Sequence, residues 1–206
     1  MMKDKVLIER AAASLRRILF LDNIDNPDLA SILNNDLGKI RPGLKLVRKI
    51  QDEMPEGTEA EFDSISNEIR FSETVWQRLL SGCTRARFTA AHELGHVVLG
   101  HEGIRRRDVR GYITAKVAIQ ENEANAFAGY FLVPTDRALE IKNQGELEQN
   151  FQLGSIAAEI RFKELESAKR KISGKKRKLP DCVIDFMKES EKRGHRFRSL
   201  PDEFRD

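Results

Sequence analysis

The sequence predicts a mostly helical α+β protein with one small β-hairpin. Over most of the 206 residues, apolar side chains recur at intervals of three and four, as on the buried face of a helix. Residues 60–63 and 67–71 instead alternate between apolar and polar side chains, which is typical of paired strands. Glycine and proline interrupt the helical pattern often enough to keep the helices short. A chain of this length can bury one core and carry an appendage.

Residues 1–53 are predicted to form an N-terminal helical segment. Its apolar residues with helical spacing are Val6, Leu7, Ile8, Leu15, Ile18, Leu19, Phe20, Leu29, Ile32, Leu33 and Leu37. Pro27 separates the first helix from the second, because proline suits the first turn of a helix and disrupts its interior. Gly38 and Pro42 interrupt the pattern again before residues 44–50, which we expect to continue the helical segment.

Residues 54–140 are predicted to form the central core. A turn at 54–57 leads into the β-hairpin, whose strands at 60–63 and 67–71 flank residues 64–66. Ser72 is expected to cap the helix that follows, and Trp76 on that helix is expected to lie in the core.

The segment His92-Glu-Leu-Gly-His96 is the strongest functional signal in the chain. Two histidines four apart on a helix lie one turn from each other, so both imidazoles can reach a single metal ion. Glu93 projects about 100° around the helix, where it can take a proton from a water on the metal, as in zinc hydrolases. The alternative is a pair of hydrogen-bonded core histidines beside an ordinary exposed Glu93.

A catalytic zinc ion needs a third protein ligand, and residues 120–134 offer it. This segment is predicted to be a helix that Pro134 ends. Glu121 and Asn125 share one face, so Glu121 can bind the metal while Asn125 hydrogen-bonds a ligand. Glu123 lies about 200° from Glu121 and is the alternative ligand. A third interpretation is that these acids only solvate a helix end.

His101 does not fit a three-histidine site. The metzincin pattern places the third histidine six residues after the second, whereas His101 lies five after His96. We expect it to be a loop histidine beyond a helix end at Gly100. The polar residues 103–118 contain Tyr112, a candidate oxyanion stabiliser, although a solvated loop is the simpler interpretation.

The run RFTAAHELGHVVLGH, followed after about twenty residues by ENEANAFAGYFLVP, resembles the ImmA/IrrE family of zinc metallopeptidases. The similarity covers roughly residues 55 to 165. It implies a zincin-like core with one zinc ion per chain, bound by His92, His96 and Glu121. It also implies an endopeptidase that cleaves a regulatory protein, such as a helix-turn-helix repressor or an antitoxin-like protein. Manganese or another divalent ion also suits these ligands.

Residues 141–168 are predicted to form a helix-turn-helix-like unit with its turn at 153–155. The inward residues of its second helix are expected to be Ile156, Ala157, Ile160 and Leu165, and the outward ones Glu159, Arg161, Lys163 and Glu164. Residues 169–206 form a basic tail, and 169–178 contain seven cations and no acid. This run is a candidate phosphate-binding site for nucleic acid or a solvated, flexible tail.

The remaining features indicate a cytoplasmic protein without membrane association. The chain has a net charge of +3, and no apolar run approaches the ~20 residues of a membrane span. Its start does not resemble a secretory signal, and Cys83 and Cys182 match no metal or redox spacing. Two other functions remain open for the same fold with dormant catalysis: a nucleic-acid-binding regulator and a toxin–antitoxin component that sequesters a partner.

Overall fold

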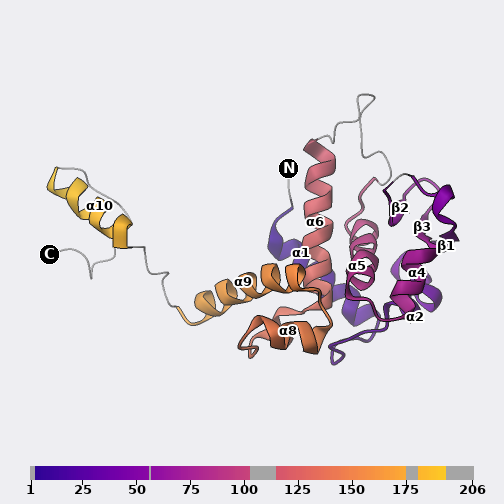
Figure 1. Ribbon diagram of the computed structural model, residues 1–206, viewed down its shortest axis with the longest axis horizontal. Helices are drawn as coiled ribbons and strands as arrows, with labels where there is room; N and C mark the ends of the chain where they lie inside the picture. The colour runs from indigo at the N-terminus through magenta and orange to yellow at the C-terminus, as the bar shows by residue number, and fades with distance from the viewer. Residues whose placement is uncertain (1–2, 56, 103–114, 175–180, 194–206) are drawn as a thin grey trace. The chain divides into compact units, whose positions relative to one another are not determined.

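The computed structural model describes residues 3–55, 57–102, 115–174 and 181–193 (Figure 1). The chain divides into two compact units, residues 1–165 and residues 166–206. The first is mostly helical with a three-stranded mixed sheet, so the predicted α+β class is confirmed.

The N-terminal region contains helices α1 (Lys5–Ile18), α2 (Leu29–Asn35) and α3 (Leu37–Ile40). The Asp4 carboxylate accepts a hydrogen bond from the Val6 amide at the start of α1, and Asp28 accepts one from Ser31 at the start of α2. These caps satisfy amides that have no partner within the helix. The helical prediction for this region is therefore confirmed as far as Ile40.

Residues 44–50, in contrast, were wrongly expected to be helical. Residues Lys45–Lys49 form strand β1, which pairs in parallel with β3 (Glu68–Ser72). Pairing across space with β3 supplies the backbone partners that a helix would have supplied locally. After the 3₁₀ turn Gln51–Glu53, β2 (Ala60–Asp63) pairs antiparallel with β3, which confirms the hairpin. The strand order is β1-β3-β2.

Two long helices form the centre of the first unit. Helix α4 (Glu73–Leu80), capped by Ser72, leads to α5 (Thr84–Val98), and α6 (Ala115–Leu132) lies beside α5 (Figure 1). A Cβ atom on Gly95 of α5 would lie 3.2 Å from the Ala124 backbone of α6. The absence of a side chain at Gly95 therefore allows the two helices to approach closely.

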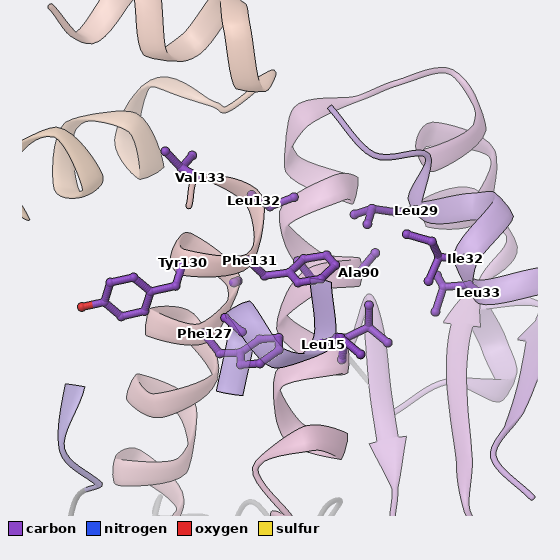
Figure 2. Close-up of a cluster of buried hydrophobic side chains, with 14 of the residues drawn as sticks. Leu15, Leu29, Ile32, Leu33, Ala90, Phe127, Tyr130, Phe131, Leu132 and Val133 are labelled. Carbon is purple, nitrogen blue, oxygen red and sulfur yellow. The ribbon is translucent and has the colours of Figure 1, made fainter. Parts of the chain in front are cut away.

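The core packs around α6. Phe127 and Phe131 point from α6 toward Leu15 of α1 and Ala90 of α5, as Figure 2 shows. Their rings stack with centroids 5.9 Å apart. Burial of such large apolar groups supplies most of the stabilisation that fixes α5 against α6.

Helices α7 (Thr135–Ala138), α8 (Gln144–Phe151) and α9 (Ser155–Ile172) follow. The predicted inward face of α9 was wrong for Ile156 and Ile160, which are 76% and 59% exposed, whereas Ala157 packs against the core. Arg161, expected to face outward, is buried together with Leu165, which was correctly placed inside. The Arg161 guanidinium donates hydrogen bonds to the Val133 carbonyl oxygen, so an arginine takes the inward position because it satisfies the end of α6.

In the second unit, the structure describes the end of α9 and helix α10 (Asp181–Lys192). Across the described residues, no helix combines the length and apolar character needed to cross a bilayer.

Candidate metal centre

Helices α5 and α6 bring three metal-binding side chains together. Ligand atoms of His92, His96 and Glu121 all lie within 4.8 Å of one another. Oε2 of Glu121 lies 3.2 Å from Nε2 of His92, and Oε1 lies 3.5 Å from Nε2 of His96. The close approach at Gly95, three residues after His92 and one before His96, makes this convergence possible.

The other nitrogen of His92 contacts an amide on α6. Nδ1 of His92 lies 2.9 Å from Oδ1 of Asn125, which is exposed. Since an amide oxygen only accepts hydrogen bonds, His92 donates through Nδ1–H, and in the neutral ring its Nε2 carries the lone pair. Sequence analysis expected Asn125 to hydrogen-bond one of the metal ligands, and the structure places it against His92.

The other nitrogen of His96 contacts a second, buried histidine. Nδ1 of His96 lies 2.9 Å from Nδ1 of His101, and Nε2 of His101 lies 3.0 Å from Oε2 of Glu123. The end of α5 explains this placement: Gly100 has φ +67°, and the His101 amide donates to the His96 carbonyl oxygen. This Schellman turn folds the chain back over the last turn of the helix. Sequence analysis assigned His101 to a loop and missed this contact.

The charges of Glu123 and His101 determine which atom donates in each of these hydrogen bonds. Burial by itself raises the pKa of Glu123, but the Lys3 amide, His101 and the Lys3 ammonium outweigh it, so the pKa is lowered and the carboxylate is ionised. Burial lowers the pKa of His101 and outweighs its hydrogen bond to Glu123, so this imidazole is neutral. His101 therefore donates through Nε2–H to Glu123 and accepts at Nδ1 from His96. Nε2 of His96, like that of His92, then carries a lone pair.

These two lone pairs test whether a metal ion fits the site. The Nε2 atoms of His92 and His96 lie 2.9 Å apart. Two lone pairs at this distance repel each other unless a positive charge lies between them. The negative charge of the Glu121 carboxylate beside them also favours a cation at this position. Two neutral imidazoles and one carboxylate are the ligand set of many catalytic zinc sites. The residues present therefore fit a divalent metal ion.

The raised pKa of His92 also shows that this position favours a positive charge. Burial lowers the pKa of His92, but the hydrogen bond to Glu121 and the charges of Glu93 and Glu121 raise it by more, so the net direction is upward. Without a metal ion, a proton held at the paired nitrogens satisfies the same electrostatic need.

Glu93 lies beside the histidines and is not an exposed helix residue. Its side chain is buried, with 2% exposure, and it lines a cavity of about 310 Å³ together with His92 and Asn125. The cavity continues along Phe88 and Thr89 of α5 and reaches residues 57–60, which lead into β2. A carboxylate at this place can exchange a proton with a molecule bound in the cavity.

The two remaining candidates stand apart from this cluster. The carboxylate of Glu123 contacts His101 and Lys3, so the structure brings Glu121, and not Glu123, to the two Nε2 atoms. Tyr112 lies outside the described residues.

Comparison with known proteins gives two similarities, one to a solved structure and one to a family model. Among solved structures, a Mycobacterium tuberculosis transcriptional regulator matches with 20% identity and a TM-score of 0.48. The match covers 73% of this chain and 44% of that protein, so the chain spans less than half of its length. No curated protein matches the chain. The family model of the IrrE N-terminal-like domain, peptidase M78, matches residues 82–164, which include the whole of α5 and α6. Residues 82–164 are therefore similar to the IrrE N-terminal-like domain.

Proposed function

We propose that this protein is a zinc-dependent endopeptidase that cleaves a regulatory protein. The observation that carries the proposal is the convergence of His92, His96 and Glu121 next to the buried carboxylate of Glu93, at a cavity. The match of residues 82–164 to the model of a peptidase family supports it.

The residues of the site would have three roles: metal binding, proton transfer and orientation of a ligand. His92, His96 and Glu121 would hold the zinc ion, which supplies an acidified water molecule and a polarised peptide carbonyl. Glu93 takes the proton of the attacking water and then delivers it to the leaving amine nitrogen. Asn125 keeps the His92 ring in the tautomer whose Nε2 lone pair faces the metal position.

The substrate in this proposal is a transcriptional repressor or an antitoxin-like protein. Support for this class comes from the resemblance of the two motifs to the ImmA/IrrE family. The cavity is compatible with a peptide segment, since it joins the apolar ring of Phe88 to the ion pair of the exposed Arg85 with Glu59. Zinc is proposed over manganese because two imidazoles and one carboxylate match common catalytic zinc sites.

The test compares the purified full chain with its Glu93→Gln variant. Both are expected to retain about one zinc ion per chain by elemental analysis. Each protein is then expressed in cells, and the new N-termini of all proteins are identified by mass spectrometry. We expect a small set of new N-termini in a regulatory protein with the wild type and none with Glu93→Gln. Identical sets with both proteins would contradict the peptidase function.

A second candidate function is nucleic-acid binding through the basic run at 169–178. Its described part, residues 169–174, contains no acid and begins with Lys169, Arg170 and Lys171 on the last turn of α9, where Lys169 forms an ion pair with Glu166. Cations spaced in this way neutralise phosphates, and the binding then weakens steeply with salt. Salt-sensitive retention of DNA that is unchanged in Glu93→Gln would favour this function over proteolysis.

A further inference from the structure

His96 is held from behind by groups that take no part in metal binding. His101 is 2% exposed, and Glu123 is also 2% exposed. Their contacts form a continuous line, from Nδ1 of His96 to Nδ1 of His101 and from Nε2 of His101 to Oε2 of Glu123. Because a carboxylate oxygen only accepts hydrogen bonds, His101 donates through Nε2–H, and Nδ1 of the neutral ring is left to accept from His96. Burial keeps water from replacing any member, so each side chain depends on the next for its hydrogen bonds.

The line continues into the N-terminal segment. The Lys3 backbone amide donates to Oε1 of Glu123, and the Lys3 ammonium lies 3.1 Å from Oε2. Lys3 directly precedes Asp4, the cap of α1, and α1 packs along α6 (Figure 1). The start of α1 is thereby tied to the same carboxylate that orients His101.

We propose that His101 and Glu123 are positioning residues of the metal centre and that Lys3 completes it by fixing Glu123. The line sets both the ring orientation and the tautomer of His96. Without it, the His96 ring can rotate or place its proton on Nε2, where it would block the metal. The inference rests on the metal site of the proposed function, but it does not depend on the protein being a peptidase.

Removal of the His101 nitrogens is expected to weaken metal binding. His101→Phe keeps an aromatic ring but offers His96 no acceptor, and we expect zinc affinity to fall by about 10- to 100-fold, as for other residues that orient metal ligands. His101→Gln presents an amide oxygen to His96 and an amide N–H to Glu123, so it should restore most of the affinity. Arg161→Met, a buried change outside the line, is the matched control and should lower stability without changing zinc affinity.

The contribution of Lys3 can be separated into its two donors. Lys3→Ala removes only the ammonium, whereas Lys3→Pro also removes the backbone N–H. We expect Lys3→Pro to weaken zinc binding by up to about tenfold, since it removes a hydrogen bond to a charged group. Lys3→Ala should have the smaller effect, because its ion pair is half-exposed.

The experiment titrates the full-length metal-free protein with zinc in competition with a chromogenic chelator. Cobalt absorption spectra of the same proteins report the ligand geometry, which a purely structural change elsewhere would leave intact. A weakened His101→Phe, a rescued His101→Gln and an unchanged Arg161→Met support the proposal. If His101→Phe fails to fold, the comparison of Lys3→Pro with Lys3→Ala decides it.

Zinc affinities within twofold of the wild type in folded His101→Phe and Lys3→Pro would overturn the inference and leave the metal site standing. A wild type that binds no zinc would overturn the metal site and the inference together. Intact zinc binding without any proteolysis would contradict only the proposed function.

Discussion

The two histidines of the metal centre are supported in opposite ways. His92 faces the cavity, and its second nitrogen contacts the exposed amide of Asn125. His96 faces the interior, and its second nitrogen contacts the buried His101, which in turn contacts Glu123. One side of the site is therefore open to solvent and the other is closed.

This difference suggests how the site divides its tasks. On the closed side, the hydrogen-bond partners are fixed by packing, which favours a permanent ligand geometry. On the open side, Glu93 and His92 line the space in which a substrate can bind. We infer that the closed side determines metal affinity and that the open side carries the chemistry.

The largest expected effect is on the open side. Glu93→Gln keeps the shape of the side chain but removes its ability to take a proton. The rate of peptide cleavage should fall by about 10²- to 10⁴-fold. Measured zinc content should stay at the wild-type level. A variant that retains its cleavage rate would show that another group accepts the proton.

Removal of a metal ligand should act on both sides together. His96→Ala should abolish tight zinc binding and, with it, the stabilisation that zinc gives the folded chain. At a zinc concentration of 100 times the Kd, this stabilisation is about 2.7 kcal/mol, a rise in Tm of roughly 5–10 °C for a chain of this size. Calorimetry with and without zinc measures it. An equal rise in Tm for His96→Ala would place the stabilising zinc elsewhere.

Substitution of Gly95 tests the close packing of α5 on α6, on which both sides of the site depend. In Gly95→Ala, the added Cβ would lie 3.1 Å from Cδ1 of Phe127 and 3.2 Å from the Ala124 backbone, so α5 and α6 must separate. We expect a loss of about 1–3 kcal/mol in the free energy of unfolding, together with weaker zinc binding. Gly38→Ala is the control, because a Cβ at Gly38 meets nothing within 4 Å. Denaturant titrations should leave Gly38→Ala at least as stable as the wild type.

The open side was easier to predict from sequence than the closed side. His92, Glu93 and Asn125 were predicted from helical spacing, because residues one and four apart have fixed relative positions on a helix. The choice of Glu121 over Glu123 also needed the resemblance to the ImmA/IrrE family. The β-hairpin was predictable for the same reason, since alternation and a short turn are local signals.

The features that sequence analysis missed depend on partners that are distant in the chain. Strand β1 forms because β3 lies beside it, and Arg161 is buried because it reaches the Val133 carbonyl. His101 joins the site because the left-handed Gly100 turns the chain back. A sequence signal did exist for His101, since a glycine directly after a motif helix predicts this turn, but its contact with Glu123 requires the packing of α5 on α6.

Substitution of Asn125 tests how much the open side alone contributes to zinc affinity. In Asn125→Ala, a water molecule can take the place of the exposed amide and accept the hydrogen bond of His92. Zinc affinity should therefore fall by less than about tenfold, which is a smaller loss than the one expected for His101→Phe. The same chelator competition compares them. A larger loss for Asn125→Ala would reverse the assignment of metal affinity to the closed side.

The smallest expected effect lies in the sheet, away from both histidines. The hydrogen bond from Arg70 lowers the pKa of Glu68, and for Asp63 the bonds from Ser66 and Ile65 outweigh burial, so its pKa is lowered too. A lowered pKa in the folded state gives stability that is present above the unfolded pKa of about 4 and is lost as the pH falls through the folded value. Arg70→Met should therefore cost about 0.2–1 kcal/mol for each ion pair at pH 7 and less at pH 3. Unfolding of the metal-free protein at both pH values isolates this effect, because no metal ligand takes part in it. An equal cost at pH 3 would mean that Arg70 stabilises the sheet by packing and not by charge.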